Sequence, residues 1–229
     1  MRSVLSVAAF SLLASLAASC GGEPNSADSG PAADASVGGE TAAVPRVEVP
    51  AEALIELSSQ FSADFALIDQ DGAPLSDDDL RGKVLLVYFG FASCPDVCPL
   101  ALGRLSGALN ELTDAERAEI APLFITVDPD RDTPEAMKSF LSFDDRIIGL
   151  TGDRAAVEAA KASFKVYAQA QPLADLALGY TVQHTSLFYL VDRSGQPRFA
   201  IQDTLTPRNW RKCCVAPLNG SILEAAVLA

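Results

Sequence analysis

The chain of 229 residues has 30 acidic and 17 basic side chains, and its formal net charge is −13. A length of this order predicts one domain with appended segments, since domains usually contain about 100 to 200 residues. The acidic balance argues against nucleic acid as a partner, because a domain that binds nucleic acid presents a basic surface to the phosphates.

The first 19 residues have the pattern of a bacterial export signal. Arg2 is their single charged residue, an apolar run extends from Val4 to Leu16, and small residues precede Cys20. This order is typical of a lipoprotein signal, which is removed so that Cys20 becomes the lipidated first residue. We therefore expect a protein of the cell envelope, anchored to a membrane by lipid and facing the periplasm or the exterior. An ordinary signal peptide with an incidental cysteine is the alternative.

Residues 20–58 are rich in Ala, Gly, Ser, Pro and acidic residues. Such a segment buries too little apolar surface to fold, so it is predicted to be a flexible acidic tether. The folded domain is expected over residues 59–229. It begins with a short hairpin that turns at Asp69–Gly72, an addition in front of the core.

The central feature is an unbroken apolar run over Val84–Phe91, which predicts a strand buried on both faces. It ends in a turn that presents Cys94 and Cys98. Because Pro99 lacks an N–H, the next helix is predicted to begin with Cys98 as its N-cap and Pro99 as its first residue. The positive end of that helix would favour a thiolate at Cys98 and lower the pKa of its thiol.

The rest of the chain alternates strands with helices. Strands are predicted over residues 121–127, 147–150, 185–191 and 198–202, and helices over 134–143 (capped by Thr133), 154–167 and from Thr206–Pro207 to the end of the chain. Residues 172–180 are predicted to be a loop. This order favours an α/β fold with a mixed central sheet and helices on both faces.

Two cysteines so placed in an exported protein leave three interpretations: a structural disulfide, a redox dithiol or a soft-metal site. Thiolates pair best with Cu(I). His184 is the single histidine, and an antiparallel last strand would bring it to the edge where the Val84–Phe91 strand ends. There it could complete a Cys-Cys-His site, although a structural histidine remains the alternative. Asp128 should face the same edge, either near the metal or paired with Arg131.

Three motifs together resemble the Sco/SenC proteins of cytochrome oxidase assembly: CPDVCP after FGF, then TVDPDRDTP, then a single histidine before an apolar strand. The resemblance covers about residues 61–203 and implies a thioredoxin-like fold in which Cys94, Cys98 and His184 bind copper. It further implies delivery of copper to the binuclear site of the oxidase, or reduction of that site's cysteines before metallation. The copper-bearing oxidase subunit and other copper chaperones are the implied partners. Gln183 stands where the family usually has aspartate.

Two further questions stay open at this point. An envelope thiol-disulfide oxidoreductase would need only the Cys94/Cys98 dithiol. Thioredoxins, however, normally carry a proline just before the corresponding strand, and Gln183-His184-Thr185 contains none. A thiol peroxidase is a weaker alternative. Cys213 and Cys214 lie outside the motifs and are interpreted as an incidental pair, with an auxiliary metal-handling or intermolecular disulfide role as the alternative.

Overall fold

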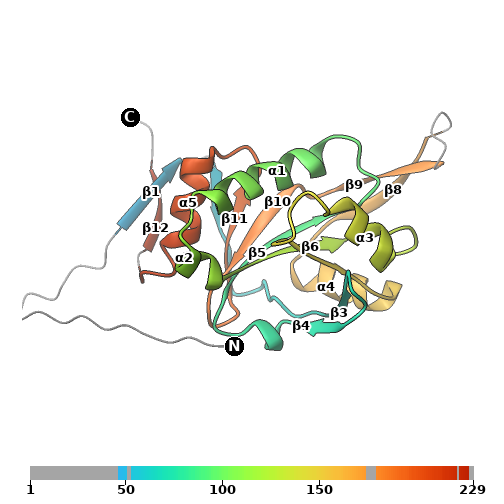
Figure 1. Cartoon of the computed structure of the whole chain (residues 1–229), viewed down its shortest axis with the longest axis horizontal. Coiled ribbons are helices and arrows are strands. Elements are labelled where there is room, and N and C mark those ends of the chain that lie inside the picture. The colour runs from blue at the N-terminus through green and yellow to red at the C-terminus, as the bar shows by residue number, and fades with distance from the viewer. Residues whose placement is uncertain (1–45, 51–52, 174–178, 221, 227–229) are drawn as a thin grey trace, which may run out of the picture. The chain divides into compact units, whose positions relative to one another are not determined.

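The structure is a computed structural model that describes residues 46–50, 53–173, 179–220 and 222–226. The predicted signal peptide (1–19) and the lipidation site Cys20 lie outside these residues. An eight-stranded sheet forms the centre of the domain (Figure 1). In spatial order its strands are β2 (Leu54–Glu56), β11 (Pro197–Gln202), β10 (Leu187–Val191), β5 (Val84–Gly90), β6 (Ile120–Thr126), β7 (Ile148–Thr151), β3 (Ala66–Asp69) and β4 (Pro74–Ser76).

The sheet is mixed, as predicted. Strands β5, β6 and β7 are parallel, whereas β10, β11, β2, β3 and β4 pair antiparallel with their neighbours. The expected early hairpin is β3–β4, and it forms one edge of the main sheet. Its turn contains Gly72 at φ 83, a left-handed conformation that glycine adopts without steric cost.

Helices cover both faces of the sheet: α1 (Val97–Asn110), α2 (Asp114–Ala118), α3 (Pro134–Phe140), α4 (Arg154–Ser163) and α5 (Pro207–Val215), with a 3-10 turn η2 at Asp78–Leu80. Threonine starts three of them. The hydroxyls of Thr113, Thr133 and Thr206 accept a backbone N–H of the first turn, and proline follows Thr133 and Thr206. These N-caps, predicted for the last two, satisfy donors that have no partner inside a helix.

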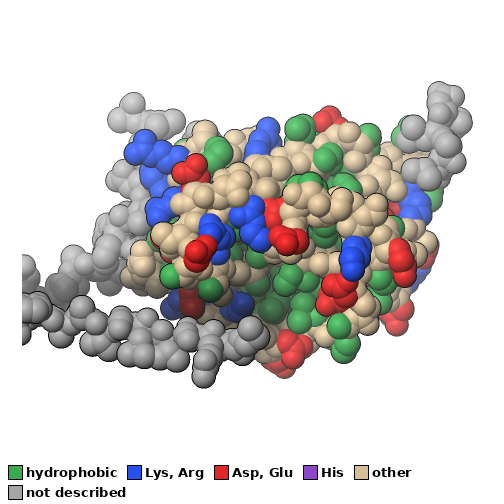
Figure 2. Space-filling view, in the orientation of Figure 1, with side chains coloured by type: hydrophobic (Ala, Val, Ile, Leu, Met, Phe, Trp, Pro, Cys, Tyr) green, Lys and Arg blue, Asp and Glu red, His purple; other side chains and the backbone are tan. Residues whose placement is uncertain are grey.

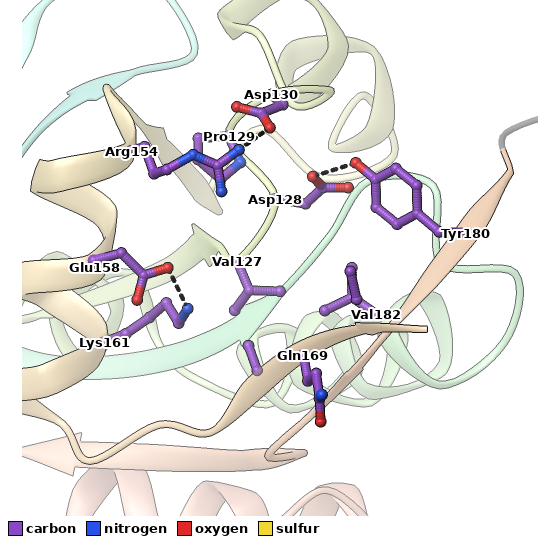
Figure 3. A pocket seen from close by; sticks show the side chains of 12 residues that line it. Val127, Asp128, Pro129, Asp130, Arg154, Glu158, Lys161, Gln169, Tyr180 and Val182 are labelled. Carbon is purple, nitrogen blue, oxygen red and sulfur yellow. Dashed lines mark hydrogen bonds and ion pairs between the residues drawn. The ribbon is translucent and has the colours of Figure 1, made fainter. Parts of the chain in front are cut away.

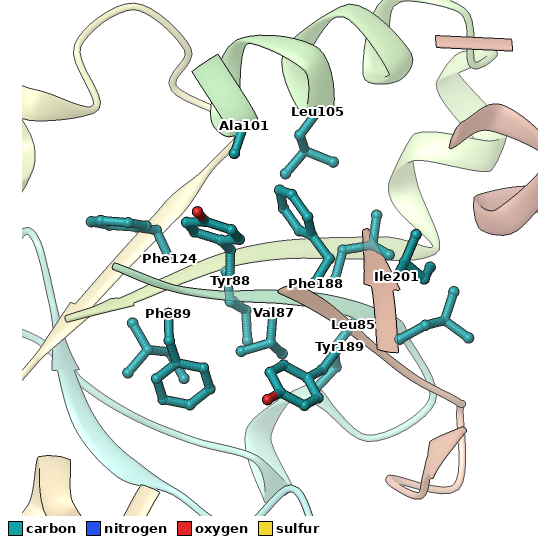
Figure 4. Close-up of a cluster of buried hydrophobic side chains, with 14 of the residues drawn as sticks. Leu85, Val87, Tyr88, Phe89, Ala101, Leu105, Phe124, Phe188, Tyr189 and Ile201 are labelled. Carbon is teal, nitrogen blue, oxygen red and sulfur yellow. The ribbon is translucent and has the colours of Figure 1, made fainter. Parts of the chain in front are cut away.

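The two faces of β5 build two parts of one core. Tyr88 packs with Phe124 and Phe188 on the face covered by α1 and α5, and Phe89 packs with Phe164 and Tyr189 on the face covered by α4 (Figure 4). Every residue of β5 is buried. An apolar run with no polar alternation is therefore explained by helices on both sides.

Helix α4 ends earlier than predicted. Lys165 follows the last turn of the helix with φ 56. The N–H of Lys165 donates to the carbonyl of Ala162, and the N–H of Val166 donates to the carbonyl of Lys161. This pattern of two hydrogen bonds around a left-handed residue is a Schellman motif, which ends a helix. The prediction of a helix to residue 167 is thus wrong, because the chain turns into a strand.

That strand belongs to a second hairpin that the sequence did not suggest. β8 (Ala168–Pro172) pairs antiparallel with β9 (Tyr180–His184) in a two-stranded sheet apart from the central one. Pro172 and Tyr180, the two ends of the predicted loop, pair with each other in this hairpin, and residues 174–178 of that loop lie outside the described part of the chain. Ala-Gln-Ala-Gln is a weak strand former, so the pairing depends on the partner strand.

The predicted domain boundary and the predicted C-terminal helix both need correction. β2 pairs with β11, and Val49, Ala53 and Leu54 are buried, so the folded part begins inside the segment assigned to the tether. The chain does not end in α5, because β12 (Ile222–Ala226) follows and pairs parallel with β1 (Arg46–Pro50). A three-residue strand with one buried side chain leaves little signal in a sequence.

The surface mixes charges of both signs. Figure 2 shows lysine and arginine interspersed with aspartate and glutamate on the face that it presents. Among the described residues, no helix has the length and apolar character needed to cross a bilayer.

Candidate functional site

The two cysteines lie where β5 passes into α1. A turn follows the strand, in which the N–H of Cys94 donates to the carbonyl of Phe91 at 3.1 Å. Cys94 is 9% exposed and Cys98, in the first turn of α1, is fully buried. Cys94 therefore keeps a small exposed area and Cys98 has none.

The start of α1 differs from the prediction. The helix begins at Val97, Asp96 is its N-cap, and Cys98 lies inside the first turn. Pro99 is accommodated there because the first helical hydrogen bond comes from the N–H of Leu100 to the carbonyl of Asp96. The N–H groups of the first helical turn have no partner inside a helix, so Pro99 loses no hydrogen bond there.

The thiolate is accordingly favoured at Cys94. The prediction of a thiolate at Cys98 is wrong. The backbone N–H of Cys98 points to Cys94 Sγ at 3.5 Å. The hydrogen bond from the Cys98 thiol, with further ones from His184 and the backbone, lowers the pKa of Cys94 to about 4 despite its partial burial. The pKa of Cys98 is raised, first by that same hydrogen bond and then by burial. The backbone N–H of Cys98, in the first turn of α1, adds a smaller contribution to the low pKa of Cys94.

His184 meets Cys98 across 86 residues of sequence. Its Nε2 lies 3.6 Å from Cys98 Sγ, and its Nδ1 lies 3.1 Å from the carbonyl oxygen of Thr185. If Nδ1–H donates to that carbonyl, Nε2 keeps a free lone pair toward the sulfur. The antiparallel pairing of β10 with β5 brings the start of one strand to the end of the other, as predicted.

Aromatic rings hold the imidazole in place. Tyr88 and Phe91 each meet His184 edge to face, with ring centroids 6.2 Å and 5.8 Å away. Burial raises the pKa of Tyr88, and the negative charge of the neighbouring cysteines adds to this effect. The phenol therefore stays neutral beside the thiols.

A depression of about 300 Å³ opens beside these groups, and Cys94, Val97, Gln183 and His184 are among the residues that line it. In the described part of the chain, no group of three or more Cys, His, Asp or Glu side chains is placed so that it could hold a metal ion. Cys98 and His184 are in contact, and Cys94 joins them through hydrogen bonds. Cys94 and His184 both line the depression and Cys98 does not, so an ion entering there would meet these two side chains before Cys98.

The backbone of Gly90 makes room for the buried thiol. A Cβ at this position would lie 2.9 Å from Cys98 Sγ and 2.7 Å from the ring of Phe124. Real side chains do not approach so closely, so only glycine fits where β5 passes under the first turn of α1.

Asp128 serves the site indirectly. One carboxylate oxygen pairs with Arg131 Nε. The other accepts the Tyr180 hydroxyl at 2.9 Å (Figure 3). The predicted ion pair with Arg131 is thus present, and both oxygens are occupied by side chains other than the cysteines or His184. Tyr180, four residues before His184, was missed from the sequence. Its place with Val182 and His184 at every second residue of one strand is the signal that could have found it.

Asp132 is a second residue that the sequence did not single out. It is 1% exposed, and one carboxylate oxygen accepts both the Thr126 hydroxyl at 2.6 Å and the backbone N–H of Ala92 at 3.0 Å. Burial raises its pKa. The aspartate holds the start of the turn that carries Cys94.

Cys213 and Cys214 lie in α5, outside the candidate site. Both are fully buried free thiols, and burial raises the pKa of Cys213 to about 12. The pKa of Cys214 is raised for the same reason. Buried, protonated thiols are inert, which favours the interpretation of an incidental pair.

Comparison with known families decides what kind of protein carries this site. The SCO1/SenC family model matches residues 55–213, which is more than half of the chain and includes both cysteines and the histidine. The chain belongs to the SCO1/SenC family. The resemblance stated from the three motifs is thereby confirmed, and so is the thioredoxin-like α/β fold.

Relatives in this family cover different shares of their own length. "Protein SCO2, mitochondrial" of Saccharomyces cerevisiae is 43% identical over 133 residues, 58% of this chain and 44% of the yeast protein. The "SCO2-like protein" of Rickettsia felis is 38% identical over 144 residues, 62% of this chain and 70% of that protein. The chain thus spans less than half of the yeast relative and more than two thirds of the rickettsial one.

One solved relative is Bradyrhizobium japonicum ScoI with copper bound. It is 37% identical, its TM-score to this chain is 0.62, and the match covers 67% of this chain and 97% of that one. At this level of identity the likeness extends beyond the fold alone.

A Gly90→Ala substitution tests the close contact under Cys98. The added methyl has to displace Cys98 Sγ or the Phe124 ring. Overpacking of this kind typically costs about 1–3 kcal/mol, so the free energy of unfolding measured with urea should fall by that amount. Gly103→Ala is the matched control, because an added methyl there meets nothing within 4 Å and lies on a helix. It should gain about 0.5–1 kcal/mol. Equal effects in the two variants would contradict the packing argument.

The reactivity of Cys94 should show its low pKa. Alkylation by iodoacetamide follows the thiolate fraction, so the Cys94 rate, measured by peptide mass spectrometry, should stop rising above about pH 5. Cys98→Ala removes the thiol that donates the strongest of these hydrogen bonds and should move the midpoint of the rate toward higher pH. A Cys94 midpoint near 9 in the unmodified protein would show that these hydrogen bonds do not stabilise the thiolate.

Proposed function

We propose that the chain is a copper metallochaperone, with copper as its cargo and Cys94, Cys98 and His184 as the ligands. The observation that carries this proposal is the 3.6 Å separation between Cys98 Sγ and His184 Nε2, beside the Cys94 thiolate. Two sulfurs and an imidazole are the donors that copper prefers in both common oxidation states.

The distance supports a shared ion. With a metal–sulfur bond of about 2.3 Å and a metal–nitrogen bond of about 2.0 Å, the lengths known for zinc, a trigonal angle separates the two donors by about 3.7 Å. The carbonyl of Thr185 next to Nδ1 favours the tautomer whose Nε2 can bind metal. Cys94 completes the set by a small movement of a side chain at the rim of the depression.

The placement of the three donors suits transfer. Cys94 and His184 line the depression and Cys98 is fully buried, so an incoming ligand from a partner can reach Cys94 and His184 before it reaches Cys98. The Bradyrhizobium relative holds copper on the same fold. We propose the copper-bearing subunit of cytochrome c oxidase as the recipient and other copper chaperones as donors, in line with the family resemblance.

The same pair of thiols supports a second function, reduction of a protein disulfide. The Cys94 thiolate would attack one sulfur of that disulfide, which breaks the S–S bond, releases the other sulfur as a thiolate and forms a mixed disulfide. Cys98 would then give its proton to the released thiolate and attack Cys94, which releases the second sulfur of the substrate as a thiolate and leaves a Cys94–Cys98 disulfide. Two electrons pass from the dithiol to the substrate. The low pKa of Cys94 favours this alternative, in which His184 takes part only through its hydrogen bond to Cys94 and is not a ligand.

Anaerobic copper titration of the reduced, tag-free domain separates the two functions. We expect one copper per chain, no binding in Cys94→Ser, and affinity weakened by a factor of about ten or more in His184→Ala, since a ligand is lost. If reduction were the whole function, His184→Ala would leave disulfide turnover unchanged and copper would bind no more tightly than to a plain dithiol.

Cys213→Ala is the control for this titration, because it removes a buried thiol outside the site. Its copper stoichiometry and affinity should equal those of the unmodified protein. Affinity that is the same in Cys94→Ser, His184→Ala and the control would overturn the proposed ligand set.

We also propose that residues 1–19 are removed and that Cys20 is lipidated, which anchors the protein to a membrane of the envelope. Expression of the full-length gene product in a bacterium fed labelled palmitate should give a labelled protein in the membrane fraction. Cys20→Ser should lose the label and leave the membrane fraction. A labelled Cys20→Ser variant would rule out this anchor.

A further inference from the structure

The strand that carries His184 stands apart from the central sheet. β9 pairs with β8 alone, and both strands belong to a separate two-stranded sheet. The ladder of the central sheet therefore does not fix the distance between His184 and Cys98. Contacts along β9 have to do so.

One face of β9 points into the domain. Tyr180, Val182 and His184 alternate along the strand, so they share a face, and Val182 is buried. Val182 lines a cavity with Val127, and Tyr180 lies at its far end (Figure 3). Tyr180 and His184 are thus the two ends of one inward row, about 13 Å apart at the usual rise of a strand.

Arg131 holds the far end of this row. Its guanidinium carbon lies 3.8 Å from the centroid of the Tyr180 ring, and Nη1 donates to the Tyr180 carbonyl at 3.1 Å. Asp128 fixes the guanidinium from the other side and accepts the Tyr180 hydroxyl. The start of β9 is therefore fixed at three points of Tyr180: its ring, its backbone carbonyl and its hydroxyl.

The same arginine reaches the segment that carries the cysteines. Its guanidinium lies 5.8 Å from the ring of Phe91, the residue at the start of the Cys94 turn. Asp132, the residue after Arg131, accepts a hydrogen bond from the backbone N–H of Ala92. The segment from Asp128 to Asp132 consequently contacts both pieces of chain that contribute donors to the site.

We infer that Arg131 is a positioning residue for the copper site: by binding Tyr180 and facing Phe91, it sets the imidazole of His184 against Cys98. This inference rests on the proposed function for its copper readout. Its structural content, that Arg131 fixes His184, concerns the metal-free protein as well.

The test is Arg131→Met, which keeps the length of the side chain and removes the planar cation. In the metal-free protein, the imidazole resonances of His184 should shift or broaden in NMR spectra, and the amides of β9 should exchange with solvent faster. Copper(I) affinity, measured by competition with a chelator, should fall by about 10- to 100-fold, as is typical when a group that orients a ligand is lost.

A double-mutant cycle identifies the route of the effect. If Arg131 acts through His184, Arg131→Met should cause no further loss of affinity in a His184→Ala background. Arg154→Met is the matched control: Arg154 lines the same cavity, but its side chain is 67% exposed and pairs with Asp130. It should leave the affinity and the His184 resonances unchanged.

Unchanged His184 resonances and β9 exchange in Arg131→Met would overturn the inference, and so would an equal loss of affinity in both backgrounds. If Arg131→Met fails to fold, Arg131→Lys carries the same test, since lysine keeps the charge beside Asp128 but lacks the flat, forked donor group. If His184→Ala alone leaves copper binding intact, the proposed ligand set fails, while the NMR and exchange measurements still decide whether Arg131 positions His184.

Discussion

The contact between Cys98 Sγ and His184 Nε2 is the interaction on which the site depends. It joins two segments that lie 86 residues apart, and neither segment could supply it alone. The antiparallel pairing of β10 with β5 brings the segments to the same edge of the sheet. Gly90 then lets the first turn of α1 lie close enough for Cys98 to reach the imidazole. The central sheet thus provides the approach, and local contacts provide the distance.

The two thiols differ because their surroundings differ. The N–H of Cys98 and its thiol both point to Cys94, so the negative charge gathers on the sulfur that lines the depression. Cys98 keeps its proton in an apolar setting until a metal ion or a disulfide sulfur bonds to it. A charged sulfur at the depression beside a neutral, fully buried one gives an order to events: Cys94 meets a soft ion or a disulfide before Cys98 does, and the inner thiol reacts second. Both proposed functions use this order.

The sequence allowed the central fold to be predicted where a pattern was strong. An unbroken apolar run identified β5, and the Thr-Pro pairs at Thr133 and Thr206 identified two helix starts. The pattern failed where partners supply the stability. β8 has weak strand-forming residues, β2 has three residues, and β1 and β12 pair across almost the whole chain. No local window contains the information that such pairings need.

The site could be predicted in its chemistry but not in its charge distribution. The spacing between prolines after a buried strand identified the two cysteines. His184 was identified because it is the single histidine of the sequence. The charged thiol was assigned to the wrong cysteine, because α1 begins two residues earlier than predicted and the N–H of Cys98 points to Cys94. The spacing of Tyr180 and His184 on one strand could have indicated their common face. The contacts of Tyr180 with Arg131 and of Asp132 with Ala92 join segments far apart in the sequence, and no spacing reveals them.

Asp132 shows that the surroundings of the site are not arranged for stability alone. Its carboxylate is buried, one oxygen accepts two hydrogen bonds, and the other has no partner among the described residues. Removing a carboxylate from water costs free energy that two hydrogen bonds only partly offset, and the raised pKa is the sign of that cost. An apolar residue would pack there at less expense but could not hold the N–H of Ala92. The buried charge is therefore best explained by the turn that it fixes, and by the Cys94 thiolate which that turn presents.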